Sequence, residues 1–209
     1  MGCYIIYMLI PLNWLVQKYG VQFTGILHVG AHECEEIADY DKYLGRESVV
    51  WIEALPDKVD FCKTTYPGIL IEQAVVSDCV ESVVFHRSNN GQSSSILDLG
   101  THMVHHPHIH YVGNYQVMTQ RLDSILNKYT IPFNFINLDI QGAELKALKG
   151  MESYLSSIQY IYTEVNSDYV YKGCCLVTEL DEYLGQFGFK RMETSWYGQA
   201  GWGDAFYIK

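Results

Sequence analysis

The amino-acid sequence predicts an α/β fold built around a mostly parallel sheet. Short apolar runs alternate with helix-compatible segments along most of the 209 residues, which is the pattern of repeated strand–helix–strand units. Several of these runs are followed at once by a glycine turn or a polar residue, as at the carboxyl end of a buried parallel strand. The length fits a single domain, residues 1–209, and a hydrophobic fraction of 48% is sufficient for a packed core.

The first part of the chain contains three predicted strands and the helices between them. Gly30 predicts a tight turn after the first strand, and Gly45 ends the helix that follows. Pro56 is suited to the first turn of the second helix. The predicted strands are residues 26–29, 48–52 and 69–76, and the predicted helices are residues 33–44 and 56–66.

Two segments stand outside this alternation. Residues 1–22 are predicted to be an N-terminal docking segment, because their apolar stretch is too short for a membrane span and lacks the flanks of a signal peptide. Residues 88–113, between strands predicted at 82–86 and 115–119, are polar and rich in histidine. An insertion of this length without its own core is usually functional or mobile, so we predict a lid over the active site.

The alternation resumes in the second part of the chain. The helix predicted from Gly142 has an apolar inner stripe at helical spacing. A Gly-rich loop separates the two strands of a terminal hairpin. The predicted strands are 134–138, 158–163, 188–193 and 205–208, and the predicted helices are 121–129, 142–155 and 176–187.

Charge and cysteine content exclude some classes of partner. The formal net charge is −10 with only 14 Lys and Arg, so we expect no nucleic-acid partner. The six cysteines include no CxxC pair, which argues against structural zinc and for a reduced, cytoplasmic protein.

Polar residues lie at the ends of four predicted strands, namely His28, Glu53, Asp139 and Glu164. In a parallel sheet these ends lie along one edge, so the four side chains are expected to converge on one crevice. Glu53 follows Gly30 at nearly the spacing of an acid that binds a ribose diol. NAD or FAD is disfavoured, because the remaining glycines of a dinucleotide loop are absent, whereas S-adenosylmethionine needs less clearance.

Three roles remain open at this edge. Asp139 is suited to taking a proton or binding a metal, but it is equally suited to capping the helix near Gly142. Glu144, in the first turn of that helix, is interpreted as structural. Ser77 either meets an adenine amino group or belongs to a plain turn.

The assembled motifs resemble the FkbM-type S-adenosylmethionine-dependent methyltransferases. The matching segments are His28-Val-Gly-Ala-His32, Ile52-Glu53-Ala54, Ala74-Val-Val-Ser77-Asp78, Gln92-Ser-Ser-Ser95, Asp139-Ile-Gln-Gly142-Ala-Glu144 and Thr163-Glu164-Val165. The resemblance implies a Rossmann-like class I methyltransferase fold: three α/β/α layers around a seven-stranded sheet with an antiparallel last strand. It also implies O-methylation, and domains of this family occur joined to glycosyltransferases, so the chain is a candidate part of a larger protein. The family usually has Asp, Gly and Glu where this chain has His28, Cys34 and Gln141.

We predict a sugar hydroxyl, in a glycan or nucleotide sugar, as the methyl acceptor. A polyketide or other small metabolite, and a non-catalytic nucleoside-binding module, are the alternatives. A divalent metal such as magnesium also remains open, with Asp139 as its ligand and Glu164 and Asn166 able to complete the site. The histidine-rich stretch is interpreted as a lid, a plain polar loop or a metal site. The predicted cofactor contacts are His28, Gly30, Ala31, His32, Glu53, Ala54, Ala74, Val75, Ser77 and Asp139. The predicted catalytic residues are Asp139, Glu164 and His108, and the predicted acceptor contacts are Ser94, Ser95, His105, Asn166, Trp196 and Tyr197.

Overall fold

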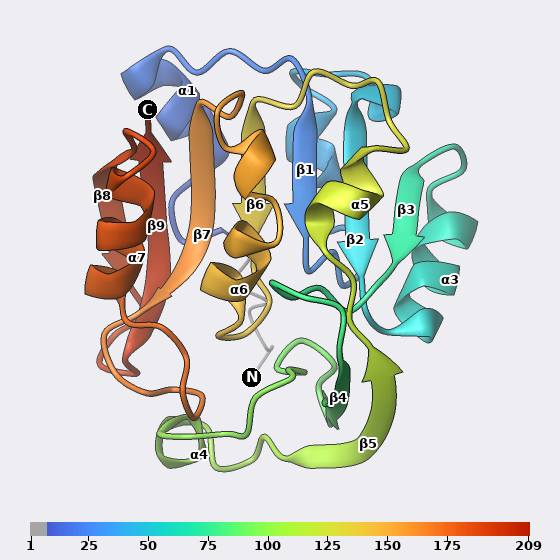
Figure 1. Cartoon of the computed structure of the whole chain (residues 1–209), viewed down its shortest axis with the longest axis vertical. Helices are drawn as coiled ribbons and strands as arrows, with labels where there is room; N and C mark the ends of the chain where they lie inside the picture. The colour runs from blue at the N-terminus through green and yellow to red at the C-terminus, as the bar shows by residue number, and fades with distance from the viewer. Residues whose placement is uncertain (1–7) are drawn as a thin grey trace.

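A seven-stranded sheet forms the centre of the computed structural model, which describes residues 8–209 (Figure 1). Five strands run parallel, and β9 pairs antiparallel with both β7 and β8. The strand order is β3-β2-β1-β6-β7-β9-β8, so the chain reverses direction across the sheet between β1 and β6. The strands are β1 (Ile26–Val29), β2 (Val49–Glu53), β3 (Leu70–Gln73), β6 (Phe135–Leu138), β7 (Tyr160–Asn166), β8 (Lys190–Trp196) and β9 (Trp202–Ile208). The predicted sheet, including its antiparallel last strand, is confirmed.

Helices cover both faces of this sheet and complete the three layers. One face packs against α5 (Leu122–Leu126), α6 (Glu144–Lys149) and α7 (Val177–Gly185). The other packs against α1 (Leu12–Tyr19), α2 (Ile37–Tyr40) and α3 (Pro56–Thr65). Two 3₁₀ turns, η1 (Arg46–Ser48) and η2 (Glu152–Tyr154), precede β2 and β7. None of the described helices combines the length and the apolar character that crossing a membrane requires.

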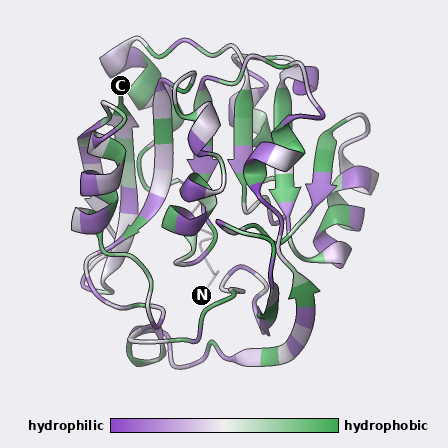
Figure 2. Ribbon diagram, viewed as in Figure 1, coloured by the Kyte–Doolittle hydropathy of each residue, from purple (hydrophilic) through white to green (hydrophobic). Residues whose placement is uncertain are grey.

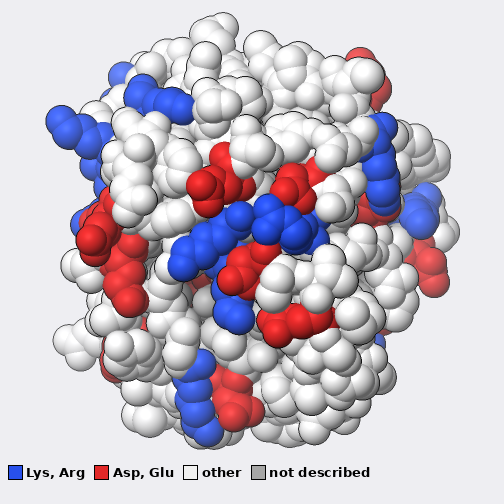
Figure 3. Space-filling view, viewed as in Figure 1, with Lys and Arg blue, Asp and Glu red and all other residues white. Residues whose placement is uncertain are grey.

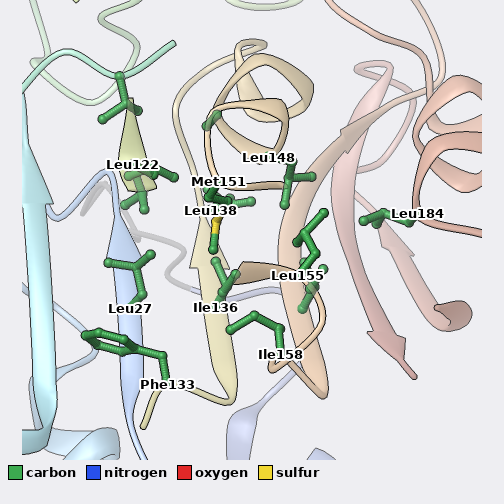
Figure 4. Packing of buried hydrophobic residues seen from close by; sticks show 14 of the residues in the cluster. Leu27, Leu122, Phe133, Ile136, Leu138, Leu148, Met151, Leu155, Ile158 and Leu184 are labelled. Carbon is green, nitrogen blue, oxygen red and sulfur yellow. The ribbon is translucent and has the colours of Figure 1, made fainter. Parts of the chain in front are cut away.

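The core is densest between β1, β6, β7 and the helices on the α6 side. Leu27, Ile136 and Leu138 of the strands belong to one cluster with Leu148 and Met151, and all five side chains are fully buried (Figure 4). Burying one such side chain contributes about 1.5–3 kcal/mol. Strands β1, β2 and β6 are accordingly buried along their length, whereas the edge strand β8 is polar and mostly exposed. Hydrophilic residues are also frequent on the outer helices (Figure 2).

The insertion forms a second, two-stranded sheet. Strands β4 (Ser82–Ser88) and β5 (Tyr111–Met118) pair antiparallel, and α4 (His102–His105) lies in the connection between them. Figure 1 places this hairpin and α4 beyond the carboxyl ends of β1, β2 and β6. Hydrogen bonds from the amides of Gly100 and His102 to the carbonyl of Val170 tie α4 to the loop after β7.

Two predicted helices are shorter than expected. His32 and Cys34 adopt positive φ angles of 42° and 57°, which interrupt a right-handed helix, so only Ile37–Tyr40 is regular. The helix predicted over 142–155 begins at Glu144, after Gln141 and Gly142 with φ angles of 57° and 95°. These positive φ angles lie next to the carboxyl ends of β1 and β6.

Candidate active site

A cavity of about 840 Å³ lies at the carboxyl ends of the parallel strands. Its walls come from the ends of β1, β2, β6 and β7, and from the loop 90–96 and the histidine-rich stretch of the insertion. It is therefore in the crevice where the strand order reverses, the usual ligand position in open α/β sheets. The volume is in the range of small-molecule sites.

Gly30 joins two loops of this cavity. Its φ angle is 94°, and a Cβ atom there would lie 1.8 Å from the carbonyl oxygen of Asp139. Glycine is thus required because the backbone after β1 packs directly against the backbone after β6.

The amides that follow Gly30 are used within the protein. Those of Gly30 and Ala31 donate to the carbonyl of Ile52, at 2.9 and 3.0 Å, and that of His32 donates to Glu53 Oε2 at 2.7 Å. A ligand at this turn is therefore contacted chiefly by side chains and carbonyl groups. These three amides are not free to bind a ligand, since the loop folds back on β2.

Glu53 is fixed at the end of β2. Its Oε1 accepts the amide of Leu55 at 2.7 Å, and its Oε2 accepts the amide of His32. Burial raises the pKa of this carboxyl group, while the two amides act in the opposite direction. Carboxylate oxygens have further lone pairs, so Glu53 remains able to accept hydrogen bonds from a ligand in the cavity.

Asp139 and Glu164 are joined by one amide side chain. Gln141 Nε2 donates to Asp139 Oδ1 at 2.5 Å and to Glu164 Oε2 at 2.7 Å, and Gln141 Oε1 accepts the hydroxyl of Tyr171. Burial, followed by repulsion from Asp139, raises the pKa of Glu164 well above its usual range. Burial also raises the pKa of Asp139, which nonetheless faces the open cavity. The proton at this site thus resides on Glu164, and Asp139 is the ionised partner.

Glu144, rather than Asp139, closes the turn before α6. Glu144 Oε1 accepts the amides of Ile140 and Gly142, at 3.0 and 3.1 Å, and the side chain is almost completely buried. The structural interpretation of Glu144 is confirmed, and Asp139 does not serve as the helix cap. Asp139 is therefore free to face a ligand.

Buried polar side chains form the floor of the cavity. The hydroxyl of Tyr40 accepts a hydrogen bond from Asn137 Nδ2 and is 2.9 Å from His28 Nδ1. His28 stacks on Trp51, and burial lowers its pKa to about 4, so it is neutral at physiological pH. Glu36 Oε2 lies 3.9 Å from His28 Nε2, and burial raises the pKa of this carboxyl group to about 8.

The last strand brings a further acid to this floor. Asp204 lies directly opposite Glu164 in the β7–β9 register. It accepts hydrogen bonds from the hydroxyl of Tyr162 and from the amide of Leu9. Burial raises the pKa of Asp204 to about 7.

Aromatic and histidine side chains form the opposite wall. The rings of Tyr197 and Trp202 stack with centroids 4.6 Å apart, and the His106 ring lies 6.1 Å from Tyr197. His102 is buried, its Nδ1 has no hydrogen-bond partner among the described residues, and burial lowers its pKa to about 4. This wall offers flat apolar surfaces beside neutral imidazoles.

The serine-rich loop of the insertion closes one side. Ser95 Oγ donates to the carbonyl of Gln141 at 2.7 Å, and Ser94 Oγ donates to the carbonyl of Gly91 at 2.6 Å. The first of these bonds links the insertion directly to the turn that carries Gln141. The loop is therefore part of the site's framework.

Most residues selected from the sequence line this one cavity. They are His28, Gly30, His32, Glu53, Ala54, Ala74, Val75, Ser94, Ser95, His108, Asp139, Glu164 and Tyr197. Five others lie outside its lining. Ala31 and Ser77 are buried behind it, His105 and Trp196 face solvent, and Asn166 is buried opposite Trp202 on β9.

Sequence reasoning missed several groups in the cavity. Gln141 was noted only as a missing carboxylate, although it bridges two acids. Asp204, Tyr162 and Glu36 were not selected. Glu36 approaches His28 only because residues 32–34 leave the helical conformation, which its spacing along the chain does not indicate. Asp204 depends on the pairing of β9 with β7, which local sequence does not encode.

The described residues offer no preformed metal site in the cavity. The cluster in residues 8–209 with ligand atoms close enough for a shared ion is Asp78, Cys79 and Glu81, and none of these lines the cavity. The described cysteines, all except Cys3, are free thiols.

Comparison with known proteins identifies similar sequences and folds. The methyltransferase FkbM domain matches residues 28–191. Over 109 residues the chain is 27% identical to the 2-O-methyltransferase NoeI of Sinorhizobium fredii (strain NBRC 101917 / NGR234). That match covers 48% of this chain and 45% of NoeI, so the chain matches less than half the length of this relative.

Two solved structures share the fold at low sequence identity. Magnesium protoporphyrin IX methyltransferase (ChlM) from Synechocystis PCC 6803, with bound SAM, aligns with a TM-score of 0.53 and 9% identity, over 94% of this chain and 75% of ChlM. Aeropyrum pernix fibrillarin, in complex with S-adenosyl-L-methionine, aligns with a TM-score of 0.52 and 10% identity, over 90% of this chain and 67% of fibrillarin. At these identities the similarity concerns the fold alone.

Proposed function

Because this chain belongs to the methyltransferase FkbM domain family, we propose that it transfers the methyl group of S-adenosylmethionine to a hydroxyl group of a sugar. The observation that carries the proposal is the position of Asp139. This carboxylate lines the same cavity as Gly30 and Glu53 and as the aromatic wall of Tyr197 and Trp202. We place the nucleoside on the Gly30–Glu53 side and the acceptor at the aromatic wall.

The cofactor side fits S-adenosylmethionine. Glu53 is positioned to accept hydrogen bonds from a ribose diol, and Ala54, Ala74 and Val75 provide apolar contacts for an adenine ring. The acidic lining suits a sulfonium group and an ammonium group. The cofactor supplies an electrophilic methyl group when bound.

Asp139 is proposed as the general base. An aliphatic hydroxyl is a weak nucleophile until its proton is removed. Asp139 Oδ1 accepts a hydrogen bond from Gln141, and the Asp139 side chain is also hydrogen-bonded to that of Glu164. In the proposed reaction the acceptor hydroxyl would donate a hydrogen bond to the carboxylate of Asp139, which would take the proton as the oxygen is methylated and later release it to solvent. The raised pKa of Asp139 strengthens it as a base, and Gln141 and Glu164 fix its orientation.

The other wall supports a sugar as the acceptor. The stacked rings of Tyr197 and Trp202 offer an apolar surface, and Asn90, Gln92 and Ser93 add polar groups to the lining of the same cavity. A sugar presents both apolar C–H faces and hydroxyl edges, and this mixed surface matches it. The name of the relative NoeI, a 2-O-methyltransferase, supports methylation at oxygen.

Two measurements test the proposal. Isothermal titration calorimetry should detect S-adenosylmethionine binding, and Glu53→Gln should weaken it about 10- to 100-fold, the effect of losing a hydrogen bond to a charged group. Asp139→Asn should retain cofactor binding but lower turnover at least ~100-fold. Asp60→Asn, at an exposed position on α3, is the matched control. Full turnover by Asp139→Asn would refute the base assignment, and absence of cofactor binding by a folded protein would refute the methyltransferase proposal.

A further inference from the structure

The charges around the cavity are of one sign. Six acidic side chains line it, and no Lys or Arg among residues 8–209 does so. Residues 1–7 contain neither of these basic residues. The six acids are Glu35, Glu36, Glu53, Asp139, Glu164 and Asp204.

The nearest basic side chains are already paired. Lys58 lies beside Gly91 at the edge of the cavity, and its Nζ is 2.5 Å from Glu33 Oε1. Arg87 makes two hydrogen bonds of 2.7 Å to Asp57, outside the cavity. On the face drawn in Figure 3, basic and acidic side chains likewise lie next to one another. A phosphate in the cavity would therefore find no free lysine or arginine from the described residues.

The histidines of the cavity do not replace these cations. Burial lowers the pKa of His28 and of His102 to about 4, and it also lowers that of His106. His32 Nδ1 is 2.6 Å from Glu35 Oε1, so this ring already faces a carboxylate. The remaining histidine of the lining, His108, is exposed. Three of the five lining histidines are thus neutral at neutral pH, and the other charged side chains of the lining are acids.

The acids of the cavity already repel one another, so they would also repel an anionic ligand. Glu35, Asp139 and Asp204 all contribute to the raised pKa of Glu36. Glu36 and Asp204 relieve part of this repulsion by holding protons near neutral pH, whereas a phosphodiester or diphosphate cannot do so. S-adenosylmethionine, with its net positive charge, is compatible with this lining.

From this arrangement we infer that the acceptor is a sugar without a phosphate group, that is, a glycoside that has already left its nucleotide carrier. This inference rests on the proposed sugar O-methyltransferase activity. The sequence leaves two forms of the acceptor open, a glycan and a nucleotide sugar, and this inference selects the glycan. It also assigns the order of reactions: a glycosyl transfer must supply the substrate, and methylation follows.

The test compares three forms of each sugar in a panel: the methyl glycoside, the sugar 1-phosphate and the nucleoside diphosphate sugar. Formation of S-adenosylhomocysteine is measured, and methylation is verified by mass spectrometry. For any sugar that is turned over, kcat/KM should be at least ~10-fold higher for the glycoside than for either phosphorylated form. Added salt should narrow the difference, because it screens the repulsion.

A variant adds the missing cation. Gln92 is exposed at the cavity, so Gln92→Lys should raise kcat/KM for phosphorylated forms relative to glycosides about 5-fold or more. Gln159→Lys, exposed and outside the cavity, should leave that ratio unchanged.

The outcomes separate the two proposals. Turnover of a phosphorylated form as efficient as that of its glycoside would overturn the inference and leave the sugar methyltransferase proposal intact. The inference would also be overturned if calorimetry showed that a nucleoside diphosphate sugar binds to the protein–S-adenosylhomocysteine complex and that Trp202→Ala abolishes this binding. If no sugar in any form is methylated or bound by protein that binds the cofactor, the sugar acceptor itself is refuted.

Discussion

Replacing Gln141 by Glu tests the proposed arrangement of the site most directly. The substitution keeps the size of the side chain and its left-handed backbone conformation, with φ of 57°. It removes the donor that joins Asp139 to Glu164 and places a third carboxyl group between them. The hydroxyl of Tyr171 still has an oxygen to donate to. The change is therefore one of charge and hydrogen bonding rather than of packing.

The loss of stability on this substitution can be calculated for the two protonation states of the new carboxyl group. If it ionises, a charge about 4 Å from one carboxylate costs roughly 4 kcal/mol at an effective dielectric constant of about 20. If it stays protonated near pH 7, holding the proton against a usual pKa of about 4.3 costs roughly 3.7 kcal/mol. We therefore expect the free energy of unfolding to fall by about 3–4 kcal/mol near pH 7, and by only about 1 kcal/mol near pH 5. The sign follows because the folded-state pKa of the new group lies above its unfolded value, so stability relative to wild type is lost as pH rises through that interval.

Urea unfolding of wild type and Gln141→Glu between pH 5 and pH 8 measures this difference. Gln159→Glu, at an exposed position, should cost less than about 0.5 kcal/mol at every pH. A difference between wild type and Gln141→Glu that is constant with pH would refute the reasoning. It would mean that the site accepts a third carboxylate, as the family pattern at this position implies.

Three further predictions concern the cavity walls. Gly30→Ala should destabilise the protein by at least ~3 kcal/mol in thermal or urea unfolding, because the new methyl group meets the Asp139 backbone. Gly68 also has a positive φ, of 85°, but a Cβ atom there would meet no other atom, so Gly68→Ala should cost only about 1–2 kcal/mol. Trp202→Ala should raise the acceptor KM at least ~10-fold with little change in the cofactor Kd. Trp196 is 41% exposed and outside the cavity, so Trp196→Ala should change neither constant. If both substitutions raised the acceptor KM equally, the assignment of the aromatic wall would be contradicted. His106→Ala should likewise raise the acceptor KM by about 5-fold or more, and His105→Ala should not; steady-state kinetics of both variants decide whether the lid contacts the acceptor through His106.

The strands could be predicted from the sequence because their signal is local. Ile26–Val29 and Phe135–Leu138 are continuous apolar runs that end on a glycine or an acid, and the structure has them within a residue of the expected limits. The helix expected over 33–44 is shorter in the structure, Ile37–Tyr40, for a reason that composition does not reveal. His32 and Cys34 adopt positive φ angles although neither is glycine, and such conformations are held by tertiary contacts. At Cys34 these include the approach of its Sγ to Cys62 Sγ at 3.2 Å.

The convergence of Glu53, Asp139 and Glu164 on one cavity could also be predicted, since it follows from parallel strands alone. The residues that hold these carboxylates in place could not be predicted. The link through Gln141 depends on a single left-handed residue after β6, and its partner Tyr171 lies in a loop 30 residues further along the chain. Such a link becomes visible only when the loops are folded together.

The direction of the last strand explains why this edge of the sheet is so acidic. Because β9 runs antiparallel to β7, Asp204 near its beginning lies opposite Glu164 near the end of β7. Like charges directly opposite each other destabilise a strand pair. Here the pair is tolerated because Glu164 holds a proton and binds Gln141, while the hydroxyl of Tyr162 donates to Asp204. A fold that needed only a stable β7–β9 pair would be better served by neutral residues at these positions, so the unfavourable pair is best explained by a ligand that benefits from the acids. A cationic sulfonium cofactor beside an uncharged acceptor meets that requirement, whereas a phosphorylated acceptor would add to the repulsion.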